Sequence, residues 1–507
     1  MKRFLVLAVF VLQFLVTAVY AQKPTFISDS LENYIKTGMT DWNIPGLAIA
    51  IVKDGKTVVM KGFGVRDVKT KAPVDENTLF MIASNTKLFT GTALAQLDYN
   101  KKLSLDDKIT KYLPGFQLYD KTSTELVSIK DVLSHRIGTK TFQGDFTFWN
   151  GTLSRQQVIE KMKLLKPVGI FRQDYGYCNS CFLTAGEVIP VVTKKSWEEY
   201  IQDSILKPIG MNNTYMLTAG MAQRSNVSKP YTNQFTGQLT ELPYDQVDNI
   251  GPAGSMVSSV SDVSKWLMTQ LDSGRFQGKQ VLPWPVIQKT RDINIATSSR
   301  KSATYPTHFR GYGLGVFMAD YAGKQVFWHT GGAFGFVTNT CFVPELNLGI
   351  TILTNNDNQG FFELLRYQIL DAYTKQPYVN RSKTALPDHL KGLAEAKSEV
   401  SKLEKRVGKA KPALAIDAYT GNYKNDIYGN ISINKLGKNR LEVVFTNHRE
   451  LKATLDYMNN DEWMLRYNNI AYGVFSTKFD VNDKKVKAVT IKANDFIEYD
   501  PYVFVKE

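Results

Sequence analysis

The chain reads FMIASNTKLFTGTALAQL over residues 80–97, and this stretch holds a serine and a lysine three positions apart, Ser84 and Lys87. The repeated apolar positions after Lys87 predict a helix. Residues i and i+3 of a helix lie on one face, so the lysine amine is expected beside the serine hydroxyl. Serine needs a neighbouring base to become a nucleophile, and the pair therefore indicates acyl-transfer chemistry.

Two later motifs supply further polar groups that this chemistry needs. The first is Tyr177-Cys178-Asn179, and the second is His329-Thr330-Gly331-Gly332. Each motif is weak alone, since the S-x-x-K spacing recurs three further times in the chain. Most matches to such short motifs are chance matches on helix faces or in turns. The order of the motifs, their spacing and their flanking sequence distinguish Ser84 from the other serines.

The flanking sequence resembles the serine β-lactamase-like hydrolases, which include class C β-lactamases, D-alanyl-D-alanine carboxypeptidases, D-aminopeptidases and related esterases. The resemblance runs from about residue 44 to about residue 355. Besides the three motifs it includes residues 44–50, 103–108, 132–135, 208–211, 253–259 and 311–315. It implies an α+β fold, in which an antiparallel sheet is flanked by helices and an inserted helical subdomain, with the site in the cleft between them.

The resemblance also implies catalytic roles. Ser84 is expected to be the nucleophile that forms an acyl-enzyme, while Lys87 and Tyr177 share the general-base work. Lys87 is expected to lower the proton affinity of Tyr177 if the two side chains lie close together. The oxyanion is expected between the backbone N–H groups of Ser84 and Gly332, the latter on an edge strand that carries His329.

Substrate binding is expected at three further residues of the motifs. Asn179 is expected to orient the substrate amide, and His329 and Thr330 are expected to face the far end of the substrate. Dedicated β-lactamases of this type carry lysine where this chain has His329. Histidine is charged only part of the time near neutral pH, so it binds a carboxylate less reliably than lysine.

The expected function is that of an exported serine hydrolase acting on D-amino-acid-containing or cell-wall-type peptides. An esterase or a weak β-lactamase using the same site is one alternative. A non-catalytic, penicillin-binding-like scaffold or binding protein is the other. The presence together of Ser84, Lys87, Tyr177, Asn179 and His329 argues against the scaffold, because binding alone does not require all five.

Other functional classes lack their sequence patterns. Ser84 has Ile82 and Thr86 where a nucleophile elbow needs glycines. The five histidines show no metal-site spacing, and no phosphate-binding or dinucleotide fingerprint is present, so neither a metal nor a cofactor is expected. The net charge of +14 allows attraction to an acidic cell-envelope polymer, but scattered lysines without a nucleic-acid motif argue against nucleic acid. The expected partner is a small-molecule or peptide substrate.

The chain is expected to comprise a signal peptide (1–21), a hydrolase domain (22–378), a charged linker (379–412) and an all-β domain (413–507). Lys2-Arg3 precedes an apolar run that ends at Val19-Tyr20-Ala21, which predicts a cleaved signal peptide and export to the periplasm or the medium. An uncleaved anchor is the alternative, and no stable membrane insertion is expected after cleavage. The all-β domain resembles the lipocalin-like domain often found behind such hydrolases.

Alternating apolar residues and turn signals predict the secondary structure. Helices are expected at 26–42 and 359–374, and strands at 46–53, 56–64, 312–320, 325–331, 335–343 and 348–354. Strands of the all-β domain are expected at 429–433, 441–445, 486–491 and 496–504. Export permits disulfides, but three cysteines cannot all pair within one chain. Buried free thiols are therefore favoured for Cys178, Cys181 and Cys341, with a Cys178–Cys181 bridge as the alternative.

Overall fold

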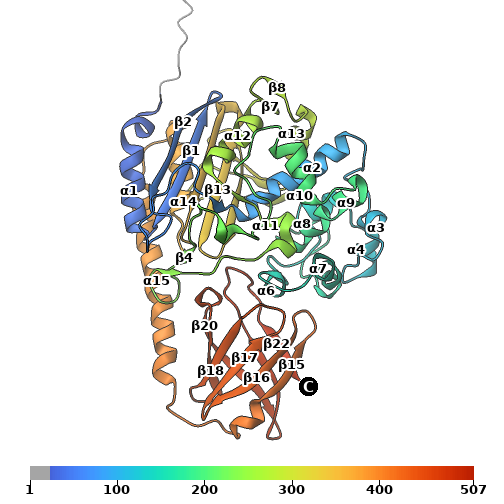
Figure 1. Ribbon diagram of the computed structural model, residues 1–507, viewed down its shortest axis with the longest axis vertical. Coiled ribbons are helices and arrows are strands. Elements are labelled where there is room, and N and C mark those ends of the chain that lie inside the picture. Colours follow the sequence, from blue (N-terminus) through green and yellow to red (C-terminus); the bar gives the residue numbers. More distant parts are fainter. Residues whose placement is uncertain (1–22) are drawn as a thin grey trace, which may run out of the picture.

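The computed structural model describes residues 23–507, and the predicted signal peptide lies outside the described residues. A mixed α and β domain stands above a separate C-terminal barrel, and one long helix runs beside both (Figure 1). This arrangement confirms the predicted α+β class with an all-β domain behind it. Within residues 23–507, no helix is both long enough and apolar enough to cross a membrane.

An eight-stranded antiparallel sheet forms the centre of the larger domain. The predicted hairpin is present, and its turn residues Asp54 and Gly55 have φ of 51° and 74°, as a two-residue hairpin turn requires. The sheet order is β2 (Lys56–Gly64), β1 (Gly46–Lys53), β14 (Leu348–Thr354), β13 (Phe336–Val343), β12 (Lys324–Ala333), β11 (Phe317–Tyr321), β10 (Arg310–Tyr312) and β9 (Ile295–Ser298). Since β1 pairs with β14, the two ends of the hydrolase sequence meet inside one sheet.

Both faces of this sheet are covered. On β1, Leu47, Ile49 and Ile51 pack into the cluster formed with η1 (Phe26–Ser30), α1 (Leu31–Asp41) and α14 (Phe361–Tyr373). The intervening small residues, such as Ala48 and Ala50, face the larger core on the other side. This alternation follows from the two-residue period of a strand.

The inserted helical region covers the second face. Here α12 (Val260–Leu271) packs on β1, β13 and β14. The turn η2 (Ala83–Asn85), which leads into α2 (Thr86–Tyr99), packs on β12 and β13. The other helices are α3 (Ile109–Tyr112), α4 (Lys121–Leu126), α5 (Ile129–Leu133), α6 (Asp145–Phe148), α7 (Arg155–Lys161), α8 (Asn179–Gly186), α9 (Val188–Thr193), α10 (Trp197–Ile201), α11 (Gly251–Gly254) and α13 (Trp284–Thr290). Short strand pairs join them: β3 (Phe80–Met81) with β6 (Val257–Ser258), β4 (Tyr231–Thr232) with β5 (Thr240–Glu241), and β7 (Arg275–Phe276) with β8 (Lys279–Gln280).

The predicted strand at 312–320 is wrong in its middle. β10 ends at Tyr312 and β11 begins at Phe317, and the chain turns between them. Gly315 has φ of 81°, and a Cβ atom there would lie 2.2 Å from the carbonyl oxygen of Lys87. Glycine is therefore required at position 315 for two reasons: the left-handed backbone and the close approach to the helix that carries Lys87.

The C-terminal domain is a closed eight-stranded barrel. Its strands are β15 (Gly421–Asn425), β16 (Gly429–Gly437), β17 (Arg440–Phe445), β18 (Lys452–Tyr457), β19 (Glu462–Tyr467), β20 (Val474–Asn482), β21 (Lys485–Ile491) and β22 (Tyr502–Lys506). Buried aromatic side chains such as Tyr423 and Trp463 fill its interior. The predicted strand at 496–504 is wrong in its first part, because residues 492–501 form a loop and β22 begins only at Tyr502.

The long helix α15 (Arg381–Arg406) connects the two domains. At its start, Trp42 Nε1 donates a hydrogen bond of 2.9 Å to Ser382 Oγ. At its end, Arg466 of the barrel is paired with Glu404 at 2.5 Å. The charged segment is thus a helix attached at both ends.

A side chain of the larger domain also enters the barrel. Phe146 of α6 is buried, and its ring lies within 6.4 Å, centroid to centroid, of six barrel rings. These rings belong to Tyr428, Phe445, His448, Tyr467, Tyr472 and Tyr502. Close by, His448 Nε2 donates to the backbone oxygen of Trp149 at 3.0 Å. The residues of α6 are therefore shared between the two domains.

We expect Phe146→Ala to lower the free energy of unfolding by about 3–5 kcal/mol, because truncating a buried aromatic ring leaves a cavity. Urea denaturation would measure the loss. The control is Phe309→Ala, since Phe309 is 63% exposed and its removal should cost within about 0.5 kcal/mol. Equal losses in the two variants would contradict the packing described for Phe146.

Candidate active site

Ser84 lies in a single 3-10 turn, η2 (Ala83–Asn85), directly before α2. Ala83 has φ of 46°, a left-handed conformation that is uncommon for a residue other than glycine. Asn85 ties the turn to the sheet, because its Nδ2 donates to Thr338 Oγ1 on β13 at 2.8 Å and to Ile82 O at 3.0 Å. The serine is thus held in a fixed backbone conformation beside the strands.

The Lys87 amine is fully buried behind Ser84. Its Nζ lies 3.1 Å from Ser84 Oγ, 2.7 Å from Asn179 Oδ1 and 2.7 Å from Ala253 O. Burial lowers the pKa of Lys87 to about 7, and the nearby Asp145 only partly opposes this. A neutral amine has two hydrogens and one lone pair. The two oxygens at 2.7 Å take the hydrogens, which leaves the lone pair for the Ser84 hydroxyl.

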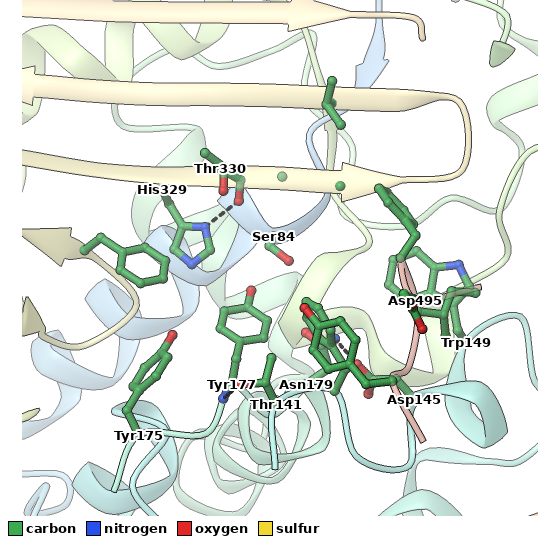
Figure 2. A pocket seen from close by; sticks show the side chains of 18 of the residues that line it. Ser84, Thr141, Asp145, Trp149, Tyr175, Tyr177, Asn179, His329, Thr330 and Asp495 are labelled. Carbon is green, nitrogen blue, oxygen red and sulfur yellow. Dashed lines mark hydrogen bonds between the residues drawn. The ribbon is translucent and has the colours of Figure 1, made fainter. Parts of the chain in front are cut away.

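Tyr177 lies on the other side of the serine, and its hydroxyl points toward Ser84 (Figure 2). The expectation that Lys87 lowers its proton affinity is wrong. Lys87 Nζ lies over the tyrosine ring, 4.7 Å from its centroid. Within residues 23–507 its hydrogen-bond partners are Ser84 Oγ, Asn179 Oδ1 and Ala253 O rather than the phenol oxygen. Burial raises the pKa of Tyr177 well above its usual range, although a hydrogen bond with Ser84 opposes the rise. The phenol is therefore protonated at neutral pH.

Asn179 is held by protein groups at both ends of its amide. Its Oδ1 accepts from Lys87, and its Nδ2 donates to Asp145 Oδ2 at 2.7 Å (Figure 2). Burial raises the pKa of Asp145 well above its usual range. The amide that was expected to orient a substrate is thus engaged in holding the Lys87 amine. No sequence motif indicated Asp145.

The strand β12 brings the third motif against the nucleophile. A Cβ atom on Gly331 would lie 2.0 Å from the backbone oxygen of Ile82, so only glycine allows this approach. β12 is an interior strand of the sheet, which corrects the expectation of an edge strand. Its pairing with β11 ends at Trp328, however, so residues 329–333 have no β11 partner within the described sheet. Gly332 lines the cavity from this open part of β12.

His329 is a buried part of the cavity wall and is neutral. Its Nδ1 donates to Thr330 O at 2.5 Å, so its Nε2 accepts from the Tyr312 hydroxyl at 3.1 Å. Burial and the nearby Lys87 lower the pKa of His329 to about 3. The imidazole therefore offers no positive charge to a substrate. Thr330 lines the same cavity, but strand alternation directs its side chain to the opposite face of the sheet from His329.

His135 and the cysteines support the tyrosine motif from behind. His135 is buried, its Nδ1 accepts from Cys178 N at 3.0 Å, and its ring lies 4.3 Å from the Tyr177 ring. His135 thus has a structural role behind the tyrosine motif. Cys178, Cys181 and Cys341 are free and buried, as the favoured prediction stated.

The cavity in front of Ser84 has a volume of about 510 Å³. Aromatic side chains dominate its wall: Phe142, Trp149, Tyr175, Tyr177, Phe317, Phe362, Phe496 and Tyr499. No lysine or arginine lies among its described lining residues, whose carboxyl groups are Asp145 and Asp495. No cluster of acidic, histidine or cysteine side chains within residues 23–507 is suited to a metal ion.

Part of this wall comes from the barrel. Asp495, Phe496, Ile497 and Tyr499 belong to the loop 492–501, and Figure 2 shows Asp495 at the cavity beside Trp149. No pattern in the sequence indicated this contribution, because the apolar residues of the loop have the alternation of a strand.

We expect Gly331→Ala to slow the labelling of Ser84 by a fluorophosphonate at least about 100-fold, because displacing a reacting group by about 1 Å has that effect. The added methyl group must push β12 away from Ile82. Gly392→Ala on α15 is the matched control, since nothing lies within 4 Å of its added Cβ. Labelling of Gly331→Ala at the unmodified rate would contradict the tight approach.

Comparisons with known proteins agree with the fold. The model of the Beta-lactamase family matches residues 31–374, more than half of the chain, and the model of a Domain of unknown function (DUF3471) matches residues 405–506. An unguisins hydrolase of Aspergillus campestris (strain IBT 28561) is 25% identical over 422 residues, which are 79% of this chain and 76% of the relative. Protein flp of Staphylococcus aureus (strain MRSA252) is 27% identical over 346 residues, 66% of this chain and 64% of the relative.

Among solved structures, the octameric penicillin-binding protein homologue from Pyrococcus abyssi matches with a TM-score of 0.60 and 21% identity. The match covers 94% of this chain and 99% of that one, so the likeness in fold includes both domains. The family model, together with the placement of the three motifs around one cavity, identifies the chain as a member of the Beta-lactamase family.

Proposed function

We propose that this protein is an exported serine hydrolase that works through an acyl-enzyme on Ser84. One observation carries the proposal. The amine of Lys87 has its two hydrogens directed to Asn179 Oδ1 and Ala253 O, and it lies 3.1 Å from Ser84 Oγ. A buried amine with a pKa of about 7 is available as a base at neutral pH.

Acylation then begins with proton transfer and nucleophilic attack, which form an oxyanion. Lys87 Nζ takes the proton of the Ser84 hydroxyl while Oγ attacks the substrate carbonyl carbon. The resulting oxyanion is held by the backbone N–H groups of Ser84 and Gly332, an arrangement in which each donor typically contributes about 10²–10³ in rate. Both residues line the cavity.

Tyr177 acts as the proton carrier to the leaving group. Because its phenol stays protonated, it can donate to the departing nitrogen or oxygen, and the Lys87 ammonium, which holds the proton taken from Ser84, then returns that proton to the phenolate. The leaving group departs, and the acyl group remains on Ser84. In deacylation a water molecule attacks the acyl carbon while Lys87 takes its proton, and that proton passes to Ser84 Oγ as the acid product is released.

The wall of the cavity favours uncharged, apolar substrates. A carboxylate next to the scissile bond would meet neutral His329 and no lysine or arginine among the described lining residues. We therefore propose peptides containing D-amino acids whose cleaved bond is remote from a free carboxylate. This disfavours efficient β-lactam hydrolysis and carboxypeptidase action, since both substrate classes carry such a carboxylate. The likeness to a fungal unguisins hydrolase supports hydrolysis in general.

An esterase is the second candidate, and the aromatic wall favours it because apolar acyl groups bind such cavities through buried area. The binding-scaffold alternative is less well supported. A scaffold has no use for a buried amine aligned on a serine, since burying that amine is costly.

The barrel is proposed to be lipocalin-like in architecture only. Its eight strands close on themselves, but side chains fill its interior. The export proposed from residues 1–21 and the attraction of the basic chain to an acidic cell-envelope polymer are consistent with a substrate found outside the cytoplasm.

The first test is covalent labelling by a fluorophosphonate, followed by intact mass measurement. We expect one adduct on the mature protein and none on Ser84→Ala, because only an activated serine reacts. Ser204→Ala is the matched control, since Ser204 has the same S-x-x-K spacing outside the site and should leave the adduct in place. An adduct that persists in Ser84→Ala would refute the assignment.

The labelling rate should rise with pH and reach half of its maximum at about pH 7. Below the pKa of Lys87 the ammonium cannot accept the Ser84 proton, so the labelling rate falls as the pH is lowered. Rates between about pH 5 and about pH 9 would measure the midpoint. A midpoint near about 10.4, the pKa of a free lysine, would contradict the role of burial.

Substrate charge is tested with two esters that share one acyl group and differ only in a carboxylate or a carboxamide beside the scissile bond. We expect the carboxamide to be preferred by about tenfold, which corresponds to about 1.4 kcal/mol. His329→Lys should narrow that preference by supplying a cation. Equal kcat/KM for the two esters in the unmodified protein would overturn the charge argument.

A further inference from the structure

The short helix α6 lies between the barrel and the site. Its first residue, Asp145, accepts the hydrogen bond from Asn179 Nδ2 at 2.7 Å. Its second residue, Phe146, is enclosed by aromatic rings of the barrel. Neighbouring residues of one turn thus point into two different domains, so any movement of α6 on the barrel would move Asp145.

Glu498 of the barrel holds the backbone of this turn. Its Oε1 accepts from Gly144 N at 2.8 Å, and its Oε2 accepts from Phe146 N at 2.9 Å. The Tyr502 hydroxyl donates to the same Oε2 at 2.8 Å. Glu498 is only 3% exposed, and three donors satisfy its buried carboxyl group. The two backbone N–H groups flank Asp145 on either side, so Glu498 fixes the position of that residue.

A continuous series of hydrogen bonds leads from this contact to the nucleophile. Asp145 holds Asn179, Asn179 Oδ1 accepts from Lys87 Nζ at 2.7 Å, and Nζ lies 3.1 Å from Ser84 Oγ. Every link in the series is buried except the serine itself, so no solvent molecule needs to be placed within it.

The same loop also touches the other side of the site. A Cβ atom on Gly332 would lie 3.0 Å from the ring of Phe496, two residues before Glu498. Phe496 and Phe334, which follows β12, stack with their centroids 5.9 Å apart. The loop 492–501 is therefore packed between the turn that carries Asp145 and the strand that carries Gly332.

We propose that Glu498 is a positioning residue for acyl transfer at Ser84, acting from the C-terminal barrel through Asp145 and Asn179 on the amine of Lys87. The barrel then contributes a residue that positions the catalytic base. The inference rests on the proposed function of Lys87 as the base.

The test compares Glu498→Gln with the unmodified full-length protein by the rate at which a fluorophosphonate labels Ser84. Glutamine keeps the shape but directs an NH₂ group at one of the two backbone N–H donors, so one hydrogen bond is lost. We expect the labelling rate to fall by about tenfold or more. Asp500→Asn is the matched control, because Asp500 pairs with Lys140 at 2.5 Å from the same loop without contacting α6. It should label within about twofold of the unmodified rate.

The pH dependence separates positioning from general loosening. Burial is the main cause of the raised pKa of Asp145, and the carboxylate form of Glu498 adds to it, so removal of that carboxylate leaves Asp145 more readily ionised. Burial also raises the pKa of Glu498, to about 7, so this effect is largest above that pH. An ionised Asp145 raises the pKa of Lys87, whose other titratable neighbours are Tyr177, Cys178, His135 and His329. The midpoint of labelling in Glu498→Gln should therefore move to higher pH by roughly half a unit or more. Hydrogen exchange of residues 141–149 should also become faster, because the Gly144 and Phe146 N–H groups lose their acceptor.

Tyr502→Phe provides a second variant in case Glu498→Gln does not fold. It keeps the ring and removes only the hydroxyl that donates to Glu498, so a smaller loss of about threefold with an upward midpoint is expected. The inference is overturned if Glu498→Gln, or Tyr502→Phe where the first variant does not fold, labels at the unmodified rate with an unchanged midpoint. It is also overturned if Asp500→Asn lowers the labelling rate as much as Glu498→Gln does. Absence of labelling in the unmodified protein would refute the proposed function, and the inference with it.

Discussion

An amine buried without a full counter-charge is the constraint around which the larger domain is arranged. Removing an ammonium from water is costly, so the Lys87 amine gives up its proton more readily than a free lysine. The neutral form needs two acceptors for its hydrogens, and Asn179 and Ala253 supply them from α8 and α11. The helices of the inserted region thus meet at one nitrogen atom, and Ser84 occupies the direction that remains.

The high pKa of Tyr177 follows from the same burial. Desolvation raises the pKa of Tyr177 and lowers the pKa of Lys87 to about 7, so an ion pair of phenolate and ammonium is disfavoured. A lysine base with a protonated tyrosine as proton carrier fits that charge distribution. His329 is also neutral for this reason, and the cavity has little positive charge to offer a substrate.

The barrel contributes to the site in two ways. Its loop 492–501 supplies cavity wall, and Glu498 holds the backbone on either side of Asp145. Conversely, Phe146 of the larger domain is buried among aromatic residues of the barrel. Because one short helix serves both contacts, cohesion between the domains and the geometry of the site depend on the same residues.

Much of this molecule follows from local sequence. The turn at Asp54-Gly55, the alternation on β1 and the spacing of Ser84 and Lys87 express backbone preferences and periodicities that a few neighbouring residues determine. The three motifs were recognisable for the same reason, and the structure brings them around one cavity. The barrel was predictable as a β domain because short segments of alternating apolar residues, separated by turn residues, are typical of β-strands.

Only the tertiary structure decided the protonation states, the partners of Asn179 and the part that the barrel takes in the site. A pKa depends on burial and on charges from distant parts of the chain, which no local pattern contains. Residues 496–501 have the apolar pattern of a strand, yet they form a loop because packing against Gly332 and α6 outweighs local propensity. Asp145 and Glu498 are 353 positions apart and belong to no motif, so their connection exists only where the two domains meet.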